Sequence, residues 1–433
     1  MSNTQMSAEI TGILNRIKES KEDLAELMLS LGNTYGPFGH EAPTAAVVHD
    51  WYQQNGITSD FVEVSDDRAC VVGRVRGDGT GKSLIFNAHL DTEASGVDFD
   101  TLMDAPDPNR VGAKREGDRI FGHTVQNDRG CMAMQMIVGR AIRESGLKLK
   151  GDLLLKSAAG ETGAAPTDEY VGSRYEGKGF GTTHLLDRGY RADYAVIAET
   201  TDFAASWIQT GAAYYKITLR GKNMYTPRLI RGEDLKTQPN AIVRAASVVQ
   251  LVEDWAVDFE KSRTRQTDCG VMRPKAQVGA IRGGIPWRPN RSSTYAALYV
   301  DVRTLPNEDV QSVTKALSTA VRSTGLDVEV DLIMAKAGFE APRDRIAPLL
   351  NEIQSAHRSI RGVEMPKFAE DAVVGMWRDT NVYNRAGIPA LTFGPSRGRA
   401  AEQGTGFIEL DDFIDGAQIY ALTALSICGE ISP

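Results

Sequence analysis

Short apolar runs that end abruptly in polar residues constrain the fold of this chain more than any other feature. The run SLIFNAHLD places four core-type residues ahead of His89 and Asp91, which is typical of a buried strand whose C-terminal end opens onto a site. Similar runs occur at residues 152–157, 194–198 and 389–393, each followed by a glycine-rich or acidic loop. Helical periods alternate with these strands and no repeat is present, so we predict an α/β protein with a ligand site at its strand ends.

The pattern changes in the middle of the chain, which indicates a second domain. The segments YYKITLRG and TYAALYVDVR alternate apolar and polar residues, and helical stretches at 240–258 and 307–323 accompany them. A chain of 433 residues is also long for one domain. We expect an inserted α+β domain at residues 212–334, within a discontinuous catalytic domain formed by residues 1–211 and 335–433.

Charge and composition exclude several classes of partner. The chain carries 49 Lys and Arg against 57 Asp and Glu, a net charge of -8, and neither sign forms long runs. This argues against nucleic acid or a membrane surface as the partner and favours a small molecule. No apolar stretch approaches the roughly 18 residues of a membrane span, and the N-terminal residues lack the features of a secretory signal, so we expect a cytoplasmic protein. The four cysteines show no CxxC spacing, and we expect them to be buried thiols.

The motifs AHLDT, QNDRG, GET and AETTD carry the chemistry. Each places one histidine or carboxylate at the end of an expected strand. An imidazole and carboxylates that converge from separate strands suit Zn, Mn or Co, and such a metal can acidify a bound water for hydrolysis. One such motif alone would be weak support, because a lone histidine at a strand end is more often a hydrogen-bonded structural residue.

The order of the motifs is more specific than any one of them. HLD, NDRG, GET and AET precede the inserted segment, and RDTNVY and GIPALTFGP follow it. This order, over nearly the whole chain, resembles the metallopeptidase and deacylase family of acetylornithine deacetylase, succinyl-diaminopimelate desuccinylase, aminoacylase and glutamate carboxypeptidase. The resemblance implies a phosphorylase/hydrolase-like zinc-peptidase catalytic domain, an inserted lid domain that pairs two chains into a homodimer, and hydrolysis of a C–N bond.

The resemblance also assigns roles by motif. His89 is a ligand of the first metal, and Asp91 orients its imidazole. Glu199, in AETTD, is the acidic ligand of the same metal. Glu161, in GET, is the general base that takes a proton from the metal-bound water.

Three positions depart from the family pattern, and all belong to the second metal site. The bridging carboxylate is replaced by Asn127, which Asp128 follows. The second acid of the glutamate pair is replaced by Thr162. The final histidine ligand is missing, since no histidine follows His357, and Glu402 lies nearest to its expected place.

These departures predict one divalent metal per chain, either Mn, Zn or Co. We expect His89, Glu199 and the side-chain oxygen of Asn127 to hold it. The alternative is that Asp128 or Glu402 rebuilds a second site, because hard cations readily accept oxygen ligands.

The inserted domain offers candidate substrate contacts. Tyr225 occupies the place of the histidine that steadies the oxyanion in the family, and its phenol can also donate a hydrogen bond, although it could simply pack at the lid edge. Arg288, Asn290 and Arg291 surround the expected substrate contact, where arginine favours a carboxylate. The alternative for these three is a solvated loop.

The C-terminal motifs complete the predicted site and lead to a hypothesis about the reaction. Asp379, Asn381 and Gly394 are expected to line the substrate end of the pocket. We predict a metal-dependent hydrolase of a C–N bond in a carboxylate-bearing substrate, with Glu161 as base. The leading specific hypothesis is hydrolytic deamination of an aryl amine, 5-nitroanthranilate to 5-nitrosalicylate, because the family includes a one-metal aminohydrolase of that kind. The alternatives are an N-acyl amino acid deacylase or dipeptidase/carboxypeptidase, and a non-catalytic binding protein.

Overall fold

The chain forms two compact units in a computed structural model that describes residues 3–92, 112–163, 165–399 and 406–429. Unit 1 comprises Met1–Trp207, Ala341–Ala369 and Arg378–Pro433, and unit 2 comprises Ile208–Glu340 and Glu370–Trp377. The segment 370–377, which the sequence placed in the catalytic domain, thus belongs to unit 2. An ion pair of 3.0 Å between Arg273 Nε and Asp371 Oδ2 helps to tie it there.

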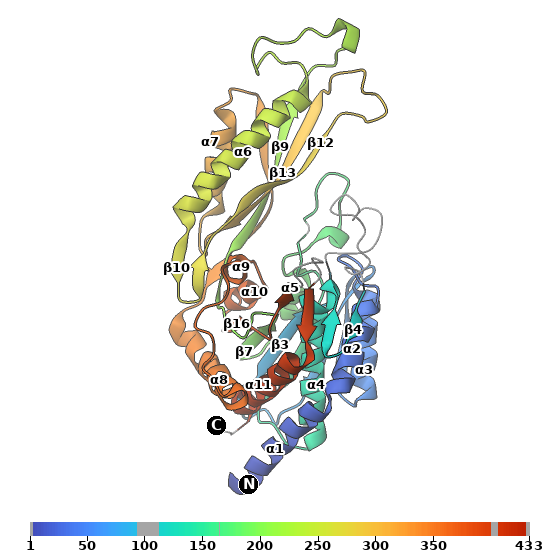
Figure 1. The fold of residues 1–433 in the computed structure, drawn as a ribbon, viewed down its shortest axis with the longest axis vertical. Coiled ribbons are helices and arrows are strands. Elements are labelled where there is room, and N and C mark those ends of the chain that lie inside the picture. The colour runs from blue at the N-terminus through green and yellow to red at the C-terminus, as the bar shows by residue number, and fades with distance from the viewer. Residues whose placement is uncertain (1–2, 93–111, 164, 400–405, 430–433) are drawn as a thin grey trace. The chain divides into compact units, whose positions relative to one another are not determined.

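A six-stranded sheet forms the centre of unit 1 (Figure 1). Its order is β1 (Thr58–Ser65), β2 (Arg68–Val75), β6 (Leu153–Ala158), β3 (Leu84–His89), β7 (Tyr194–Ala198) and β16 (Ala390–Phe393). The last four strands are parallel, whereas β1 and β2 are antiparallel to their neighbours. Every residue of β3, β6 and β16 is buried, as expected for parallel strands covered on both faces.

Helices cover both faces of this sheet. Phe86 points to α11 (Leu410–Cys428), where its ring lies 4.5 Å from that of Tyr420. The neighbouring Ile85 points the other way, into a cluster with Leu185 of α5 (Phe180–Asp187) and Tyr383 of α10 (Thr380–Arg385). The remaining helices of this unit are α1 (Asn3–Glu19), α2 (Lys21–Asn33), α3 (Ala42–Gln54), α4 (Gly130–Ser145) and α8 (Arg343–Arg361).

Short elements border the sheet of unit 1. A π-helical turn, η2 (Val125–Arg129), leads directly into α4, and η3 (Ser173–Tyr175) is a single 3-10 turn. A small sheet has the order β17 (Gly398–Arg399), β18 (Gly406–Glu409), β5 (Arg119–Phe121) and β4 (Lys114–Glu116).

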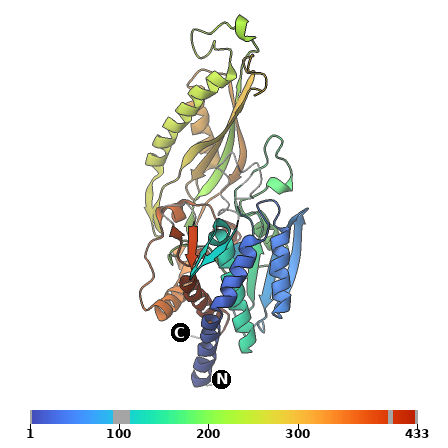
Figure 2. The same cartoon turned by 45° about the vertical axis from the view of Figure 1, so that its right-hand side comes forward.

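Unit 2 is a four-stranded antiparallel sheet with two helices packed on one face (Figure 2). The strand order is β12 (Ala276–Gly283), β13 (Tyr295–Thr304), β9 (Gly211–Arg220) and β14 (Val328–Lys336). The helices are α6 (Ala241–Arg263) and α7 (Val310–Arg322), which begin after the N-cap side chains of Asn240 and Asp309. The shorter elements are β8 (Ile208–Gln209), η4 (Thr226–Arg228), β10 (Arg265–Thr267), β11 (Gly270–Met272), β15 (Phe339–Glu340) and α9 (Asp371–Gly375).

The predicted fold class, an α/β catalytic domain with an inserted α+β domain, is confirmed. The four cysteines are buried and unbridged. Among the residues that the structure describes, no helix combines the length and the apolar character needed to cross a membrane.

Candidate metal centre

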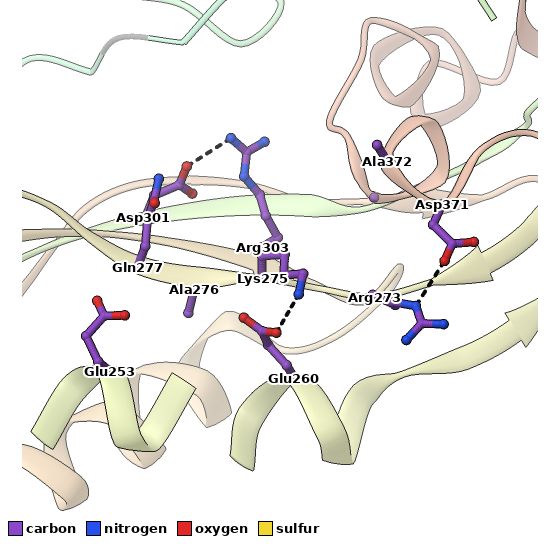
Figure 3. Close-up of a pocket in the computed structure, with 11 residues that line it drawn as sticks. Glu253, Glu260, Arg273, Lys275, Ala276, Gln277, Asp301, Arg303, Asp371 and Ala372 are labelled. Atoms are coloured by element: carbon purple, nitrogen blue, oxygen red, sulfur yellow. Dashed lines mark hydrogen bonds and ion pairs between the residues drawn. The ribbon is translucent and has the colours of Figure 1, made fainter. Parts of the chain in front are cut away.

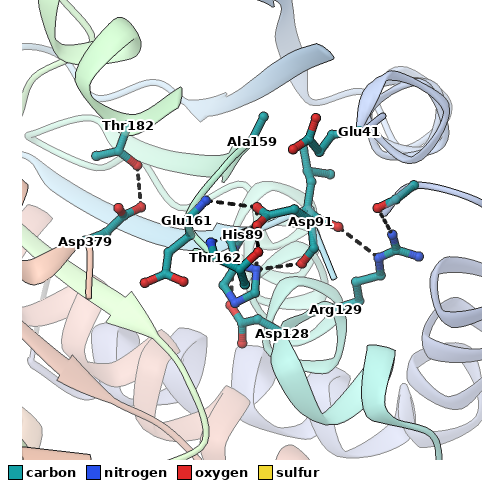
Figure 4. Close-up of polar contacts among 12 residues, drawn as sticks. Glu41, His89, Asp91, Asp128, Arg129, Ala159, Glu161, Thr162, Thr182 and Asp379 are labelled. Atoms are coloured by element: carbon teal, nitrogen blue, oxygen red, sulfur yellow. Dashed lines mark hydrogen bonds and ion pairs between the residues drawn. The ribbon is translucent and has the colours of Figure 1, made fainter. Parts of the chain in front are cut away.

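Three neighbouring parallel strands bring a histidine and two glutamates together at one edge of the unit 1 sheet, and Figure 4 shows two of these residues, His89 and Glu161. His89 ends β3, Glu161 follows β6 and Glu199 follows β7. Ligand atoms of these three residues lie within 4.8 Å of one another, and all three side chains are buried. The C-terminal ends of adjacent parallel strands meet at the same edge, which explains the convergence.

The donor set of this cluster fits a divalent cation. Glu161 Oε1 and Glu199 Oε1 are both buried and have no hydrogen-bond partner within the described residues. A buried carboxylate oxygen without a partner is costly, and a metal together with a water that it binds would satisfy both. His89 Nδ1 lies 2.9 Å from the backbone oxygen of Asp91, so Nδ1 carries the proton and Nε2 is the nitrogen available to a metal. One imidazole and two carboxylates suit Zn, Mn or Co.

Asp91 joins the imidazole to the loop of Glu161. Its carboxylate accepts hydrogen bonds from the backbone N–H of Glu161 at 3.0 Å, and from the N–H and hydroxyl of Thr162 at 2.8 and 2.5 Å. Its Oδ1 also lies 3.8 Å from His89 Nδ1. Asp91 therefore reaches His89 chiefly through its backbone carbonyl, and its carboxylate mainly fixes the turn that carries Glu161.

The charges around His89 and Asp91 stabilise each other. Burial lowers the pKa of His89, but the negative charges of Asp91, Asp128 and Glu161 outweigh it and raise this pKa to about 9. Burial also acts to raise the pKa of Asp91, yet the charge of His89 and the hydrogen bonds from Thr162 and Glu161 hold it below its ordinary value. The carboxylate of Asp91 is thus charged at neutral pH.

The positions that depart from the family pattern have distinct surroundings. Asn127 is half-buried in η2, and the peptide bond that joins it to Asp128 is cis. Asp128 Oδ2 accepts a hydrogen bond of 3.2 Å from the backbone N–H of His89, and burial raises the pKa of this carboxyl to about 7. The Thr162 hydroxyl is engaged with Asp91. Glu402 lies outside the described residues.

Arg129 is a buried residue whose role the sequence analysis missed. Its guanidinium donates to the backbone oxygens of Leu90 at 3.0 Å, Leu31 at 2.7 Å, Thr34 at 2.6 Å and Gly36 at 2.6 Å. It therefore joins the end of β3 to α2 and the loop after it. Its place in NDRG, beside Asp128, was the available signal.

Arg378 is a second missed residue, and it lies at the metal cluster itself. Its side chain is buried and forms an ion pair between Nη1 and Glu199 Oε2. Burial lowers the pKa of this guanidinium, while the carboxylates of Glu161 and Asp128 favour its charged form. The residue immediately precedes Asp379 in the motif RDTNVY, for which the sequence predicted a role only for the aspartate and the asparagine.

Asp379 and Asn381 lie in the interior of unit 1. Asp379 Oδ2 accepts hydrogen bonds from Asn87 Nδ2 at 3.1 Å and Thr182 Oγ1 at 2.5 Å (Figure 4). Burial and the nearby charge of Glu161 raise the pKa of Asp379 to about 7. Asn381 is buried in α10. The expected substrate contacts of these two residues stay a prediction.

Gly394 lies directly against the backbone of Glu199. A Cβ at this position would overlap the carbonyl oxygen of Glu199. The backbone N–H of Gly394 also donates to Thr201 Oγ1 at 3.0 Å. Because Gly394 has no side chain, the backbone of Glu199 can lie directly against it. This holds whether or not Gly394 also contacts a substrate.

The predicted lid residues lie close together in unit 2. Tyr225 is exposed, forms an isolated β-bridge with Arg291, and has the guanidinium of that arginine 5.8 Å from its ring centre. The backbone oxygen of Asn290 accepts a hydrogen bond of 3.0 Å from Thr226. Arg288 and Arg291 line a cavity of about 810 Å³ within this unit. Their roles toward a substrate stay predictions.

Another cavity of unit 2, of about 660 Å³, is lined by charged side chains (Figure 3). Its lining includes three ion pairs: Lys275–Glu260 at 2.6 Å, Arg303–Asp301 at 2.9 Å and Arg273–Asp371 at 3.0 Å. Because these charges neutralise one another, we assign no ligand to this cavity.

The chain is similar to known proteins in sequence and in fold. The sequence pattern of peptidase family M20/M25/M40 matches residues 94–426. N-formyl-4-amino-5-aminomethyl-2-methylpyrimidine deformylase of Bacillus subtilis is 27% identical over 202 residues, 46% of this chain and 43% of that protein. Carboxypeptidase G2 of Pseudomonas sp. (strain RS-16) is 27% identical over 278 residues, 63% and 57% of the two chains. The chain thus matches about half the length of these two relatives.

Longer matches come from more distant proteins. A probable succinyl-diaminopimelate desuccinylase of Staphylococcus epidermidis is 21% identical over 426 residues, 93% of this chain and 96% of that protein. Human carnosine dipeptidase 1 superposes with a TM-score of 0.70 at 14% identity, covering 97% and 98% of the two chains. A tripeptidase of Staphylococcus aureus gives 0.67 at 15% identity, covering 94% and 98%, and both structures share the fold. The resemblance predicted from motif order is confirmed, and the chain belongs to peptidase family M20/M25/M40.

Proposed function

We propose that this chain is a metal-dependent hydrolase of a C–N bond in a small, carboxylate-bearing substrate, with one divalent Mn, Zn or Co ion per chain. The observation that carries the proposal is the buried cluster of His89, Glu161 and Glu199, in which two carboxylate oxygens have no partner within the described residues. Membership of the family supports the same chemistry.

The residues of the site have separate roles in the proposed reaction. His89 and Glu199 would hold the ion, with the side-chain oxygen of Asn127 as a further ligand. A divalent metal held there would supply Lewis acidity, which would make water a nucleophile at neutral pH. Glu161 takes a proton from the attacking water and passes it to the departing nitrogen; the water oxygen joins the carbon as the C–N bond breaks. Asp91 holds the backbone of Glu161 in place.

For the substrate we propose an amide, as in an N-acyl amino acid deacylase or a carboxypeptidase. The named relatives are a deformylase, a carboxypeptidase and a desuccinylase, and none of these three is an aryl-amine hydrolase. Hydrolytic deamination of an aryl amine such as 5-nitroanthranilate is the second candidate. It is favoured by the one-metal pattern, since the Thr162 hydroxyl bonds to Asp91 and provides no carboxylate for a second ion.

The first test is metal content together with Glu161→Gln. Protein purified without added metal is expected to hold about one ion per chain by mass spectrometry. If Glu161 acts as the base, Glu161→Gln retains the metal and loses at least about 100-fold in kcat. The matched control is Glu116→Gln, which alters an exposed glutamate of β4 and should leave both quantities unchanged. Loss of the ion from Glu161→Gln would instead make Glu161 a metal ligand, and absence of metal from the parent would favour a binding protein.

A substrate panel separates the two reactions. N-formyl and N-succinyl amino acids and dipeptides test amide hydrolysis, and ammonium release from 5-nitroanthranilate tests aryl deamination. Turnover of the aryl amine alone would reject the amide proposal.

We also propose that the lid residues bind substrate and that unit 2 pairs two chains. Arg288 and Arg291 would hold the carboxylate, with Asn290 beside them and Tyr225 as a hydrogen-bond donor to the developing anion. The strand β12 is a sheet edge with a largely exposed surface, which suits pairing. Arg291→Met should raise KM more than it lowers kcat, and light scattering should give twice the chain mass; a monomer would refute the pairing.

A further inference from the structure

A fixed cation lies among the carboxylates of the proposed metal centre. Arg378 forms its ion pair with Glu199, and the charges of Glu161 and Asp128 also act on its guanidinium. Arginine stays protonated inside proteins, so this positive charge is permanent. All four side chains are buried, where charges are weakly screened and an uncompensated carboxylate is costly.

Two of the three positions expected to bind a second metal hold no carboxylate. Asn127 is neutral, and the hydroxyl of Thr162 donates to Asp91 at 2.5 Å. The carboxylates of Glu161, Glu199 and Asp128 nevertheless remain, and one metal ion does not neutralise three negative charges. The guanidinium supplies the missing counter-charge.

We propose that Arg378 is the second positive charge of this site: it neutralises the carboxylates around Glu199 in the role that a second metal has in other family members, and so limits the site to one metal ion. The inference rests on the proposed metal site.

The sign of the effect on metal affinity follows from the charges. A metal bound to Glu199 Oε1 would face a guanidinium held on Oε2 of the same carboxylate. Two positive charges at such short range in a buried site repel each other strongly. Arg378 therefore weakens metal binding even though it also holds Glu199 in place. If Arg378 served only to orient Glu199, its removal would weaken binding instead, by the 10- to 100-fold typical of groups that support a metal ligand.

The test is calorimetric titration of metal-free protein with Mn²⁺ and Zn²⁺, with circular dichroism to verify folding. Arg378→Met is expected to bind the first ion at least about 10-fold more tightly, or to take up a second ion per chain. Arg378→Lys keeps a positive charge and should stay within a few-fold of the parent. The matched control is Arg397→Met, which removes a half-buried arginine whose charge also reaches Arg378 and should change affinity only a few-fold.

The outcomes separate this inference from the proposed function. If the parent binds metal and the folded Arg378→Met variant binds it equally or more weakly, the role of Arg378 is refuted but the proposed metal site is not. No binding in the parent or in any variant refutes the proposed metal site and this inference together. If Arg378→Met does not fold, Arg378→Gln removes the same charge with a polar side chain, and the same tightening is expected of it.

Discussion

Replacement of Asp91 by asparagine tests whether this carboxylate organises the metal centre. Three donors converge on it: the N–H of Glu161, and the N–H and hydroxyl of Thr162. Hydrogen bonds to a charged acceptor contribute about 1.5–3 kcal/mol each. Asparagine keeps one acceptor oxygen, so at least one buried donor faces an amide N–H₂ group instead. We expect Asp91→Asn to lower the free energy of unfolding of the metal-free protein by about 2–4 kcal/mol.

Urea unfolding at neutral pH measures this loss, with Thr162→Val as the matched control. That variant removes only the hydroxyl donor and should cost about 1.5–2 kcal/mol, the lower part of the range for one such bond. Metal affinity of Asp91→Asn should fall about 10- to 100-fold, since the carboxylate of Asp91 fixes the turn that carries Glu161 and places a negative charge 3.8 Å from His89 Nδ1. A loss of stability no larger than that of Thr162→Val, with metal affinity unchanged, would show that Asp91 does not organise the site.

Two further variants test other parts of unit 1. Gly394→Ala should weaken metal binding at least about 10-fold in titration, because its Cβ would displace the backbone of Glu199, whereas Gly12→Ala, with open space around it, should not. Burial lowers the pKa of Lys156 to about 7, so the unfolded chain binds a proton that the folded chain lacks between about pH 7 and 10.5. The free energy of unfolding should therefore rise between pH 7 and pH 9 by about 2 kcal/mol more in the parent than in Lys156→Met, as measured by urea titration at each pH. An equal change in the two proteins would show that Lys156 titrates normally.

The fold could be predicted because its signals are local. The strand β3 is entirely buried, and the run that forms it is apolar up to Asn87. A strand covered on both faces needs such a run, and parallel neighbours place their C-terminal ends at one edge. That rule alone brings His89, Glu161 and Glu199 to the same edge, although each follows a different strand.

The contacts of Arg378 and Thr162 depend on the tertiary structure and could not be predicted from local patterns. Arg378 is separated from Glu199 by the whole of unit 2 along the sequence, and an arginine beside an aspartate usually indicates a solvated loop. The hydroxyl of Thr162 could have faced the metal cluster, but the turn after β6 directs it to Asp91. The assignment of segment 370–377 to unit 2 could not be predicted for the same reason, because its partner Arg273 is distant in sequence.

The substitutions at this site make one consistent charge pattern. Relative to the family arrangement, Asn127 and Thr162 each remove a carboxylate, and in this chain the guanidinium of Arg378 forms an ion pair with Glu199. One divalent ion together with the guanidinium of Arg378 balances the formal charges of Asp128, Glu161 and Glu199. Counted over Arg378 and these three carboxylates, a second divalent ion would leave a doubly positive charge, which the carboxylate of Asp91 reduces without removing; an excess of positive charge is unfavourable in a buried site. A single substitution that restored one family ligand, such as Thr162→Glu, should therefore not suffice to bind a second ion while Arg378 is present, and should do so only in combination with Arg378→Met.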